Sequence, residues 1–161
     1  MILLFQPVVW FEIPDNIDFA AAASTWVPYL TAYPVYSQSN LKSGDYVLII
    51  AGTSAVGQAA IDLARELGAI PIVTTRSRRK AAQLRQLKQL NHVIISNEED
   101  LVTRISEITV GKGVQFIFDP IGGNALPDLL QVASVGAKFM NMAFLVAVSA
   151  NFRQDFCLVK V

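Results

Sequence analysis

Apolar residues follow two different periods along this chain. Short runs rich in apolar and β-branched residues, the pattern of strands buried on both faces of a sheet, lie at 46–51, 70–75, 92–95, 114–118 and 137–142. The segments between these runs carry apolar residues at helical spacing, as at Ala81, Leu84 and Leu87. Strands and helices that alternate in this way require right-handed crossover connections. The pattern therefore predicts an α/β fold, a doubly wound parallel sheet with helices on both faces.

Polar residues and prolines mark the ends of the helices expected before the first strand. Asp18 is placed to cap a helix over 19–23. A second helix is expected to carry Pro28 in its first turn and to kink or end at Pro34, because a proline inside a helix removes a hydrogen bond.

Similar signals divide the rest of the chain. Ser96 and Glu99 have the spacing of a capping box before the third crossover helix, and 124–132 is expected to form the last helix. Residues 1–14 are predicted to form an extended N-terminal segment, and 15–161 a single dinucleotide-binding domain.

The stretch 45–68 combines a buried strand, a turn of small residues and an amphipathic helix that Gly68 is placed to end. The first N–H groups of a helix have no partner within it, and aligned peptide dipoles add about half a positive charge there. Gly52 is expected to permit the turn and Gly57 to let the helix lie close to the sheet, as in the G-x-G-x-x-G motif. Ser54 occupies the middle position, where its Cβ crowds a phosphate and its hydroxyl can donate to one. The stretch predicts a pyrophosphate site; a tight turn that binds no ligand is the alternative.

The residues after the second predicted strand indicate which dinucleotide fits. In NAD-binding folds an Asp or Glu about 20 residues beyond the glycines binds the ribose 2′-hydroxyl, but 74–80 reads TTRSRRK and holds no carboxylate. The cations open a helix capped by Ser77, where they oppose the macrodipole unless an anion binds. The 2′-phosphate of NADP is the expected anion, with Arg76 and Arg79 as forked donors and Ser77 giving its hydroxyl and N–H. A solvated basic helix start is the alternative.

Composition excludes several other classes of function. Of 161 residues, 53% are hydrophobic and 16% charged, so some apolar surface is expected to meet another domain or subunit. Zero net charge gives no indication of binding to nucleic acid or to an anionic membrane. Cys157 and His92 are the only residues of their kinds, which excludes a disulfide framework and a Cys/His zinc cluster within this sequence. No Cys/His or Ser/His/Asp nucleophile set is expected, because His92 lies at the start of a predicted strand and Cys157 lies near the end of the sequence. A reducing cytoplasm is the simplest setting, and the apolar stretch 1–11 is too short to span a bilayer.

Several short motifs occur in a specific order along 18–142. They are DFAAAAS, the triplet Thr31-Ala32-Tyr33, LKSGDYVLI, AGTSAVGQAAIDLARELGA and FDPIGG. In this order they resemble the Rossmann-type nucleotide-binding domain of the medium-chain dehydrogenase/reductase superfamily, and above all its zinc-free quinone oxidoreductases and 2-enoyl thioester reductases. The resemblance implies an NADPH-binding domain of an oxidoreductase that transfers hydride to a quinone or an activated C=C bond.

The resemblance also implies individual cofactor contacts. The threonine of the TAY triplet would lie near the nicotinamide, the turn after the first strand would contact pyrophosphate, and the loops after the fourth and fifth strands would border the cofactor. Together with the residues expected from the turn and the basic segment, the predicted site comprises Thr31, Gly52, Thr53, Ser54, Ala55, Val56, Gly57, Arg76, Ser77, Arg79, Asp119, Pro120, Asn141 and Met142. For each loop the alternative is an ordinary strand-to-helix connection.

Members of the resembled family carry an N-terminal substrate domain, which is expected to be missing here. That domain would supply the catalytic tyrosine or the metal ligands, so no catalytic residue and no metal site is predicted; Tyr29, Tyr33 and Tyr36 are expected to pack in or beside the linker helix. The resemblance further implies a homodimer joined at sheet edges, a contact that the apolar segment 143–161 would suit. Within 143–161, residues 144–148 could extend a strand. A non-catalytic or degenerate nucleotide-binding or dimerisation fragment is the alternative function.

Overall fold

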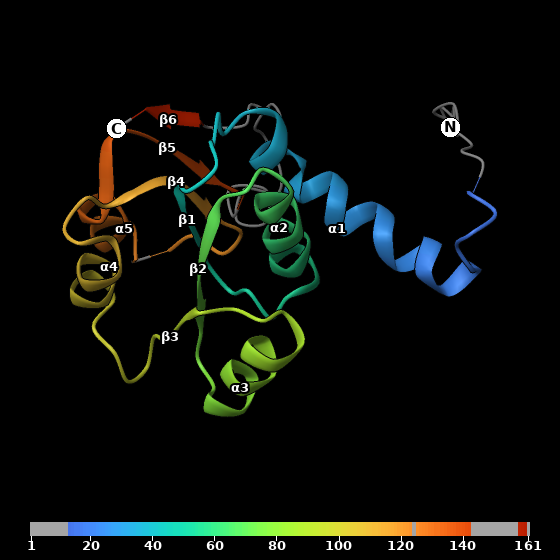
Figure 1. Cartoon of the computed structure of the whole chain (residues 1–161), viewed down its shortest axis with the longest axis horizontal. Helices are drawn as coiled ribbons and strands as arrows, with labels where there is room; N and C mark the ends of the chain where they lie inside the picture. The colour runs from blue at the N-terminus through green and yellow to red at the C-terminus, as the bar shows by residue number, and fades with distance from the viewer. Residues whose placement is uncertain (1–12, 124, 143–157, 161) are drawn as a thin grey trace, which may run out of the picture.

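The structure, a computed structural model, describes residues 13–123, 125–142 and 158–160. In this part of the chain six strands form one sheet in the order β3-β2-β1-β4-β5-β6 (Figure 1). The strands are β1 (Tyr46–Ile49), β2 (Ile70–Thr75), β3 (His92–Ile95), β4 (Val114–Asp119), β5 (Ala133–Asn141) and β6 (Leu158–Lys160). The first five are parallel, whereas β6 pairs antiparallel with β5. The predicted parallel sheet is confirmed.

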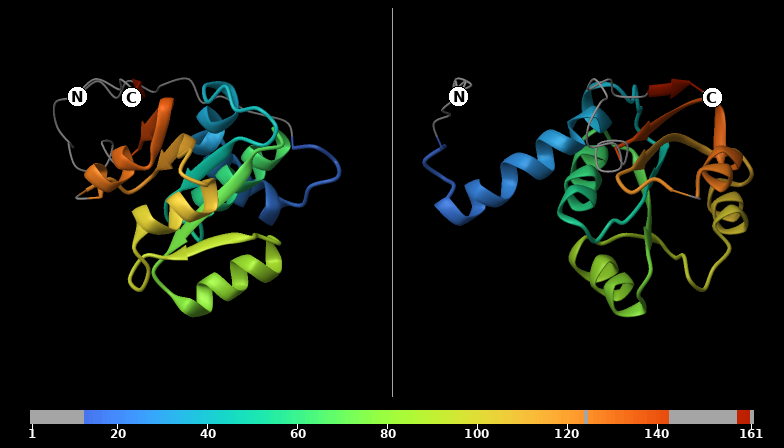
Figure 2. Two further views of the ribbon diagram at one scale, coloured as in Figure 1. Left: turned by 60° about the vertical axis from the view of Figure 1, so that its left-hand side comes forward. Right: turned by 180° about the vertical axis from the view of Figure 1, so that it is seen from behind.

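Helices cover both faces of the sheet (Figure 2). The helices are α1 (Phe19–Ser37), α2 (Ala55–Glu66), α3 (Arg78–Leu87), α4 (Leu101–Thr109) and α5 (Leu126–Gln131). On one face Val47 and Ile49 belong to a core that includes residues of α1, α2 and α3, and on the other Leu48 packs with residues of α4 and α5. Because successive strand residues point to opposite faces, burial on both sides explains the continuous apolar run of β1.

The order of the strands creates a switch point at the centre of the sheet. From β1 the chain proceeds outward through β2 and β3, and then crosses back to β4 and β5 on the other side of β1. In register, Ile49 of β1 lies between Val73 of β2 and Phe118 of β4. Open α/β sheets bind ligands outside the carboxyl ends of the strands at such a point.

One prediction about α1 is wrong. Instead of two helices broken near the prolines, Phe19–Ser37 is one helix that passes through both Pro28 and Pro34, with Asp18 accepting from the N–H of Ala21 as the cap. The C-terminal part of α1 packs on α2, and Pro34 is buried there. We attribute the continuity of α1 to this packing, which offsets the hydrogen bonds that the prolines remove.

The structure also corrects several boundaries. The predicted capping box is wrong: Asp100 caps α4 by accepting from the N–H of Thr103, and Glu99 accepts from the N–H of Ile95 instead. The last helix begins at Leu126 and ends at Gln131, and β5 begins at Ala133, earlier than predicted. The possible strand at 144–148 and most of the segment 1–14 lie outside the described residues.

Candidate functional site

The turn between β1 and α2 presents unpaired backbone donors. Ser54 caps α2, because its Oγ accepts from the N–H of Gly57 at 3.0 Å, and its own N–H donates to the Ala51 carbonyl at 2.9 Å. Within the described residues, the N–H groups of Thr53, Ala55 and Val56 have no acceptor. These donors lie at the positive end of the helix, so the turn fits a bound pyrophosphate. The Ser54 N–H is engaged in the turn, which leaves only its hydroxyl hydrogen to donate.

Gly52 of this turn and Gly57 of α2 are required for different contacts. Gly57 was expected to let the helix lie close to the sheet; the close approach that the structure shows is to the turn after β1, because a Cβ on Gly57 would lie 2.5 Å from the Ala51 carbonyl oxygen and 2.8 Å from Gly52 Cα. The expected role of Gly52 is wrong, because the left-handed residue of the turn is Ala51, with φ 54°. Gly52 is required for packing: its Cβ would lie 1.9 Å from Cγ1 of Val73 on β2.

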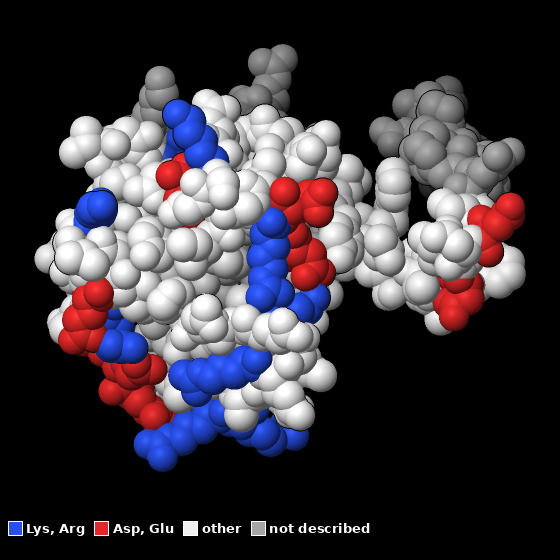
Figure 3. Space-filling view, viewed as in Figure 1, with Lys and Arg blue, Asp and Glu red and all other residues white. Residues whose placement is uncertain are grey.

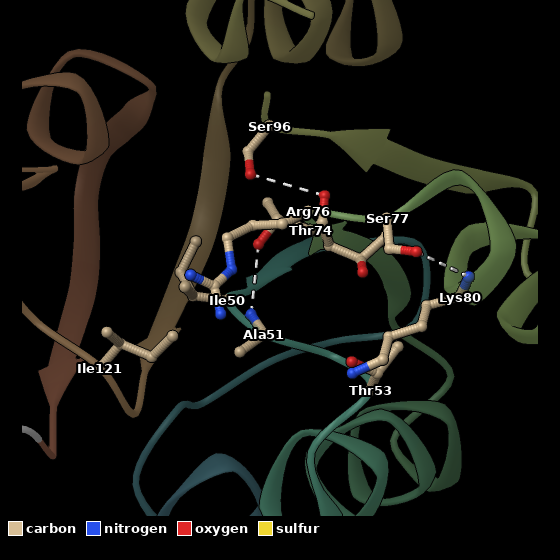
Figure 4. A pocket seen from close by; sticks show the side chains of 10 residues that line it. Ile50, Ala51, Thr53, Thr74, Arg76, Ser77, Lys80, Ser96 and Ile121 are labelled. Carbon is tan, nitrogen blue, oxygen red and sulfur yellow. Dashed lines mark hydrogen bonds between the residues drawn. The ribbon is translucent and has the colours of Figure 1, made fainter. Parts of the chain in front are cut away.

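A pocket of about 290 Å³ lies at the carboxyl ends of β1, β2 and β3, next to this turn (Figure 4). The loop that follows β4 supplies its remaining side, so the pocket occupies the switch point of the sheet. Its lining residues are Ile50, Ala51, Thr53, Thr74, Thr75, Arg76, Ser77, Lys80, Ser96 and Ile121. A hydrogen bond of 3.2 Å from the N–H of Ala51 to Thr74 Oγ1 ties the β1 turn to β2.

Two cations line the pocket and point in different directions. Figure 4 shows the Lys80 side chain extending towards Thr53, while the Arg76 side chain extends towards Ile50 and Ile121. Neither has an ion-pair partner among the described residues. Lys80 was not among the predicted site residues, although its place in the first turn of a Ser77-capped helix was a signal that could have identified it.

The other cations of α3 lie outside the pocket. Arg78 forms a 2.8 Å ion pair with Glu98, and Arg79 is exposed and is not a lining residue. Figure 3 shows Lys and Arg side chains gathered over α3. Of the segment predicted to bind the 2′-phosphate, the structure therefore brings Arg76, Ser77 and Lys80 to one cavity.

Asp119 shapes the loop after β4. It is 2% exposed, and its Oδ1 accepts from the N–H groups of Ile121 and Gly122, both at 2.9 Å. This arrangement turns the chain so that Ile121 lines the pocket. Asp119 therefore shapes the pocket by holding the loop and does not line the pocket itself. The half-buried Pro120, which follows it, does not line the pocket either.

The remaining predicted residues lie away from the pocket. Asn141 ends β5 opposite Asp119, and the N–H of the buried Met142 donates to the Asp119 carbonyl. Thr31 lies on α1, half-buried, and its Oγ1 donates to the Val27 carbonyl at 2.8 Å. Asn141 and Met142 share the carboxyl edge of the sheet with the pocket, whereas Thr31 belongs to the helix that packs on α2.

The titratable groups with shifted pKa values lie outside the pocket. The pKa of Tyr29 is raised by burial and by its 2.8 Å hydrogen bond to Asp62, which also binds Lys88. The pKa of His92 is lowered by burial and by Arg104. His92 starts β3, so it lies at the amino edge of the sheet, opposite the pocket. Tyr29 therefore anchors α1 to α2, and neither group is placed to act in the pocket.

Two further features are absent from the described part of the chain. It contains no group of three or more His, Cys, Asp or Glu side chains that could hold a metal ion. No helix in this part is long and apolar enough to cross a membrane.

Known proteins resemble this chain in sequence and structure. Phenolphthiocerol synthesis polyketide synthase Pks15/1 of Mycobacterium bovis is 33% identical over 133 residues, which is 81% of this chain and 6% of that protein. The JamJ enoyl reductase superposes with a TM-score of 0.76 at 31% identity, covering 89% of this chain and 42% of the reductase. Escherichia coli quinone oxidoreductase, solved with NADPH, has a TM-score of 0.72 at 32% identity, covering 79% of this chain and 39% of that one.

The chain covers only part of the length of each of these relatives. The chain spans 5–8% of the length of the polyketide synthases and about two fifths of the reductases. The family described as zinc-binding dehydrogenase matches residues 55–160, which include α2 and every later element. The resemblance to medium-chain dehydrogenases/reductases is confirmed, and the chain belongs to the zinc-binding dehydrogenase family.

Proposed function

We propose that this chain is the NADPH-binding part of an oxidoreductase that reduces a quinone or an activated C=C bond. The observation that carries the proposal is a pocket at the switch point that lies next to the unpaired amides of the turn before α2. Lys80, which has no ion-pair partner among the described residues, lines this pocket, and no carboxylate does. A carboxylate there would accept from the 2′-hydroxyl of NAD, whereas a lysine suits the 2′-phosphate of NADP. The NADPH complex of the Escherichia coli quinone oxidoreductase supports this choice.

Each part of the site has a distinct task in this proposal. The N–H groups of Thr53, Ala55 and Val56 bind the pyrophosphate, and the Ser77 hydroxyl and Lys80 bind the 2′-phosphate. NADPH supplies the hydride when bound. The chain's own residues hold and orient the dinucleotide, and none of them is proposed as a catalytic acid.

We further propose that the substrate is a small molecule bound by a domain outside this chain. The support is α1, whose exposed apolar side chains include Phe19 at 85%, Val27 at 64% and Leu30 at 59% exposure. Figure 1 shows the first half of α1 extending away from the sheet and the other helices. An apolar helix surface of this kind is typical of a contact with another domain.

The assembly and location are also proposals. A homodimer is proposed because β6 is an edge strand of the described sheet, and edge strands offer backbone groups for pairing with a second copy. A cytoplasmic location is proposed because the single Cys157 suits a reducing compartment.

Titration of the purified chain with NADPH and NADH, followed by cofactor fluorescence, tests the central proposal. We expect NADPH to bind more tightly, and Lys80→Ala to weaken NADPH about tenfold to a hundredfold while leaving NADH unchanged, since a charged hydrogen bond is lost. Lys112→Ala removes an exposed lysine far from the pocket and serves as the matched control. Absence of binding by both dinucleotides would reject the proposal and favour a degenerate, non-catalytic module.

A further inference from the structure

A second cavity, of about 140 Å³, lies between α2 and α3. It shares Thr53 and Lys80 with the pocket at the switch point, and Figure 4 shows the Lys80 side chain extending towards Thr53. Lys80 therefore borders both cavities. The remaining residues that line the smaller cavity come from α2, from α3 and from the position that ends α3, and they are Gln58, Gln83, Leu84, Leu87 and Lys88.

One wall of the smaller cavity is apolar and open to water. The helical spacing of Ala81, Leu84 and Leu87 predicts one buried stripe, and the first two residues are 0% and 5% exposed. Leu87 is 77% exposed instead, although it lines the cavity together with Leu84. An apolar group in the cavity would remove part of this surface from water, which favours binding by about fourfold for each CH₂ group that is buried.

The polar lining residues determine which charge the smaller cavity accepts. Lys88 Nζ donates to both carboxylate oxygens of Asp62 at 2.8 Å, so its charge is already paired. Among the described residues, Lys80 has no ion-pair partner and the Gln83 side chain has no hydrogen bond. No carboxylate lines the cavity. A ligand carboxylate accepts hydrogen bonds from an ammonium group and from an amide, so it matches these two side chains.

We propose that the smaller cavity binds a small aliphatic carboxylate, with Lys80 and Gln83 on its oxygens and Leu84 and Leu87 on its chain. The consequence for the dinucleotide rests on the proposed NADPH function. Because Lys80 also binds the 2′-phosphate, the carboxylate and NADPH compete for one cation. The carboxylate should weaken NADPH and leave NADH unchanged, and NADPH should weaken the carboxylate by the same factor. The smaller cavity is then a regulatory site that lowers the preference for NADPH.

Hexanoate is the probe, and acetate and hexanol are matched controls that lack the chain and the charge, respectively. Chemical-shift titrations of isotope-labelled protein at about 0.15 M constant ionic strength follow the methyl groups of Leu84 and Leu87 and the side-chain amide of Gln83. We expect hexanoate to perturb these groups and to bind at least about tenfold more tightly than acetate, because it buries more CH₂ groups. Hexanol should bind more weakly than hexanoate, since it forms no ion pair with Lys80.

The effect on the dinucleotides is measured by fluorescence titration with saturating hexanoate. NADPH should weaken about threefold to tenfold while NADH stays unchanged. This loss is smaller than that expected from Lys80→Ala, because the lysine is shared and not removed. Hexanol should change neither affinity.

The substitution Leu87→Ser separates the smaller cavity from the dinucleotide pocket. Leu87 lines the smaller cavity but not the pocket at the switch point, so its loss should weaken hexanoate about threefold to tenfold and leave NADPH binding without hexanoate unchanged. Val135→Ser is the matched control, because Val135 is an exposed apolar residue on β5 that lines neither cavity. It should change neither affinity.

The carboxylate site and the proposed function fail in different ways. The site is refuted, while the proposed function stands, if hexanoate leaves the signals of Leu84, Leu87 and Gln83 unchanged, if it weakens NADPH and NADH alike, or if Leu87→Ser protein binds it as tightly as the unaltered chain does. If the unaltered chain binds neither NADPH nor NADH, the proposed function is refuted and the regulatory role with it, and the chemical shifts still decide whether the cavity binds a carboxylate.

Discussion

The substitution Gly57→Ala tests whether steric contact with the turn between β1 and α2 outweighs the higher helix propensity of alanine. In an unconstrained helix Gly→Ala stabilises by about 0.8–1.0 kcal/mol. Here the new Cβ would lie 2.5 Å from the Ala51 carbonyl oxygen and 2.8 Å from Gly52 Cα, and both are backbone atoms that move only with the turn. Overpacking of this kind costs about 1–3 kcal/mol, so the net effect should be a loss of up to about 2 kcal/mol.

If the new Cβ displaces the turn, NADPH binding should weaken by at least about tenfold, since one charged hydrogen bond to an amide contributes about 1.5–3 kcal/mol. Urea unfolding followed by far-ultraviolet circular dichroism and a fluorescence titration measure the two effects. Glu66→Ala, at the exposed last residue of α2, is the control and should change the free energy of unfolding by less than about 0.5 kcal/mol. A Gly57→Ala protein that is more stable by about 1 kcal/mol and binds NADPH normally would refute the reasoning.

Two further predictions concern the supports of the site. Asp119→Ala should lower the free energy of unfolding by about 1–3 kcal/mol in urea titrations, because the N–H groups of Ile121 and Gly122 lose their acceptor. The control Asp128→Ala changes an exposed carboxylate and should have little effect. Equal effects of the two substitutions would contradict the loop's dependence on Asp119. Because the pKa of Tyr29 is raised above its ordinary 10.0, the folded state retains the phenol proton more strongly, and its contribution to stability should decline as the pH rises above 10.0. Urea unfolding at several alkaline pH values should show this decline in the unaltered chain relative to Tyr29→Phe; parallel curves would contradict it.

The sequence predicted those parts of the fold that local patterns control. Strands buried on both faces must be continuously apolar, so β1 and β4 were evident from their composition. A close approach at Gly57 was predictable because glycine has no Cβ, although the atoms approached are those of the turn and not of the sheet. The Ser77 cap was equally evident, since a serine preceding a helical pattern satisfies an N–H group of its first turn.

Other features depend on tertiary contacts that no local pattern reveals. The continuity of α1 through Pro34 goes with packing on α2, and the need for glycine at position 52 comes from Val73 on a neighbouring strand. Arg76 and Lys80 come from neighbouring parts of one segment, but their side chains extend to different sides of the pocket. Spacing along the sequence places such residues near a site, but their orientation decides what each one contacts.

Amide chemical-shift mapping with NADPH on isotope-labelled protein tests the central claim most directly. The account predicts that the largest perturbations occur at Thr53, Ala55 and Val56, with a second group at Ser77 and Lys80. Perturbations confined to the opposite edge of the sheet, where His92 lies, or an unchanged spectrum at saturating NADPH, would contradict it.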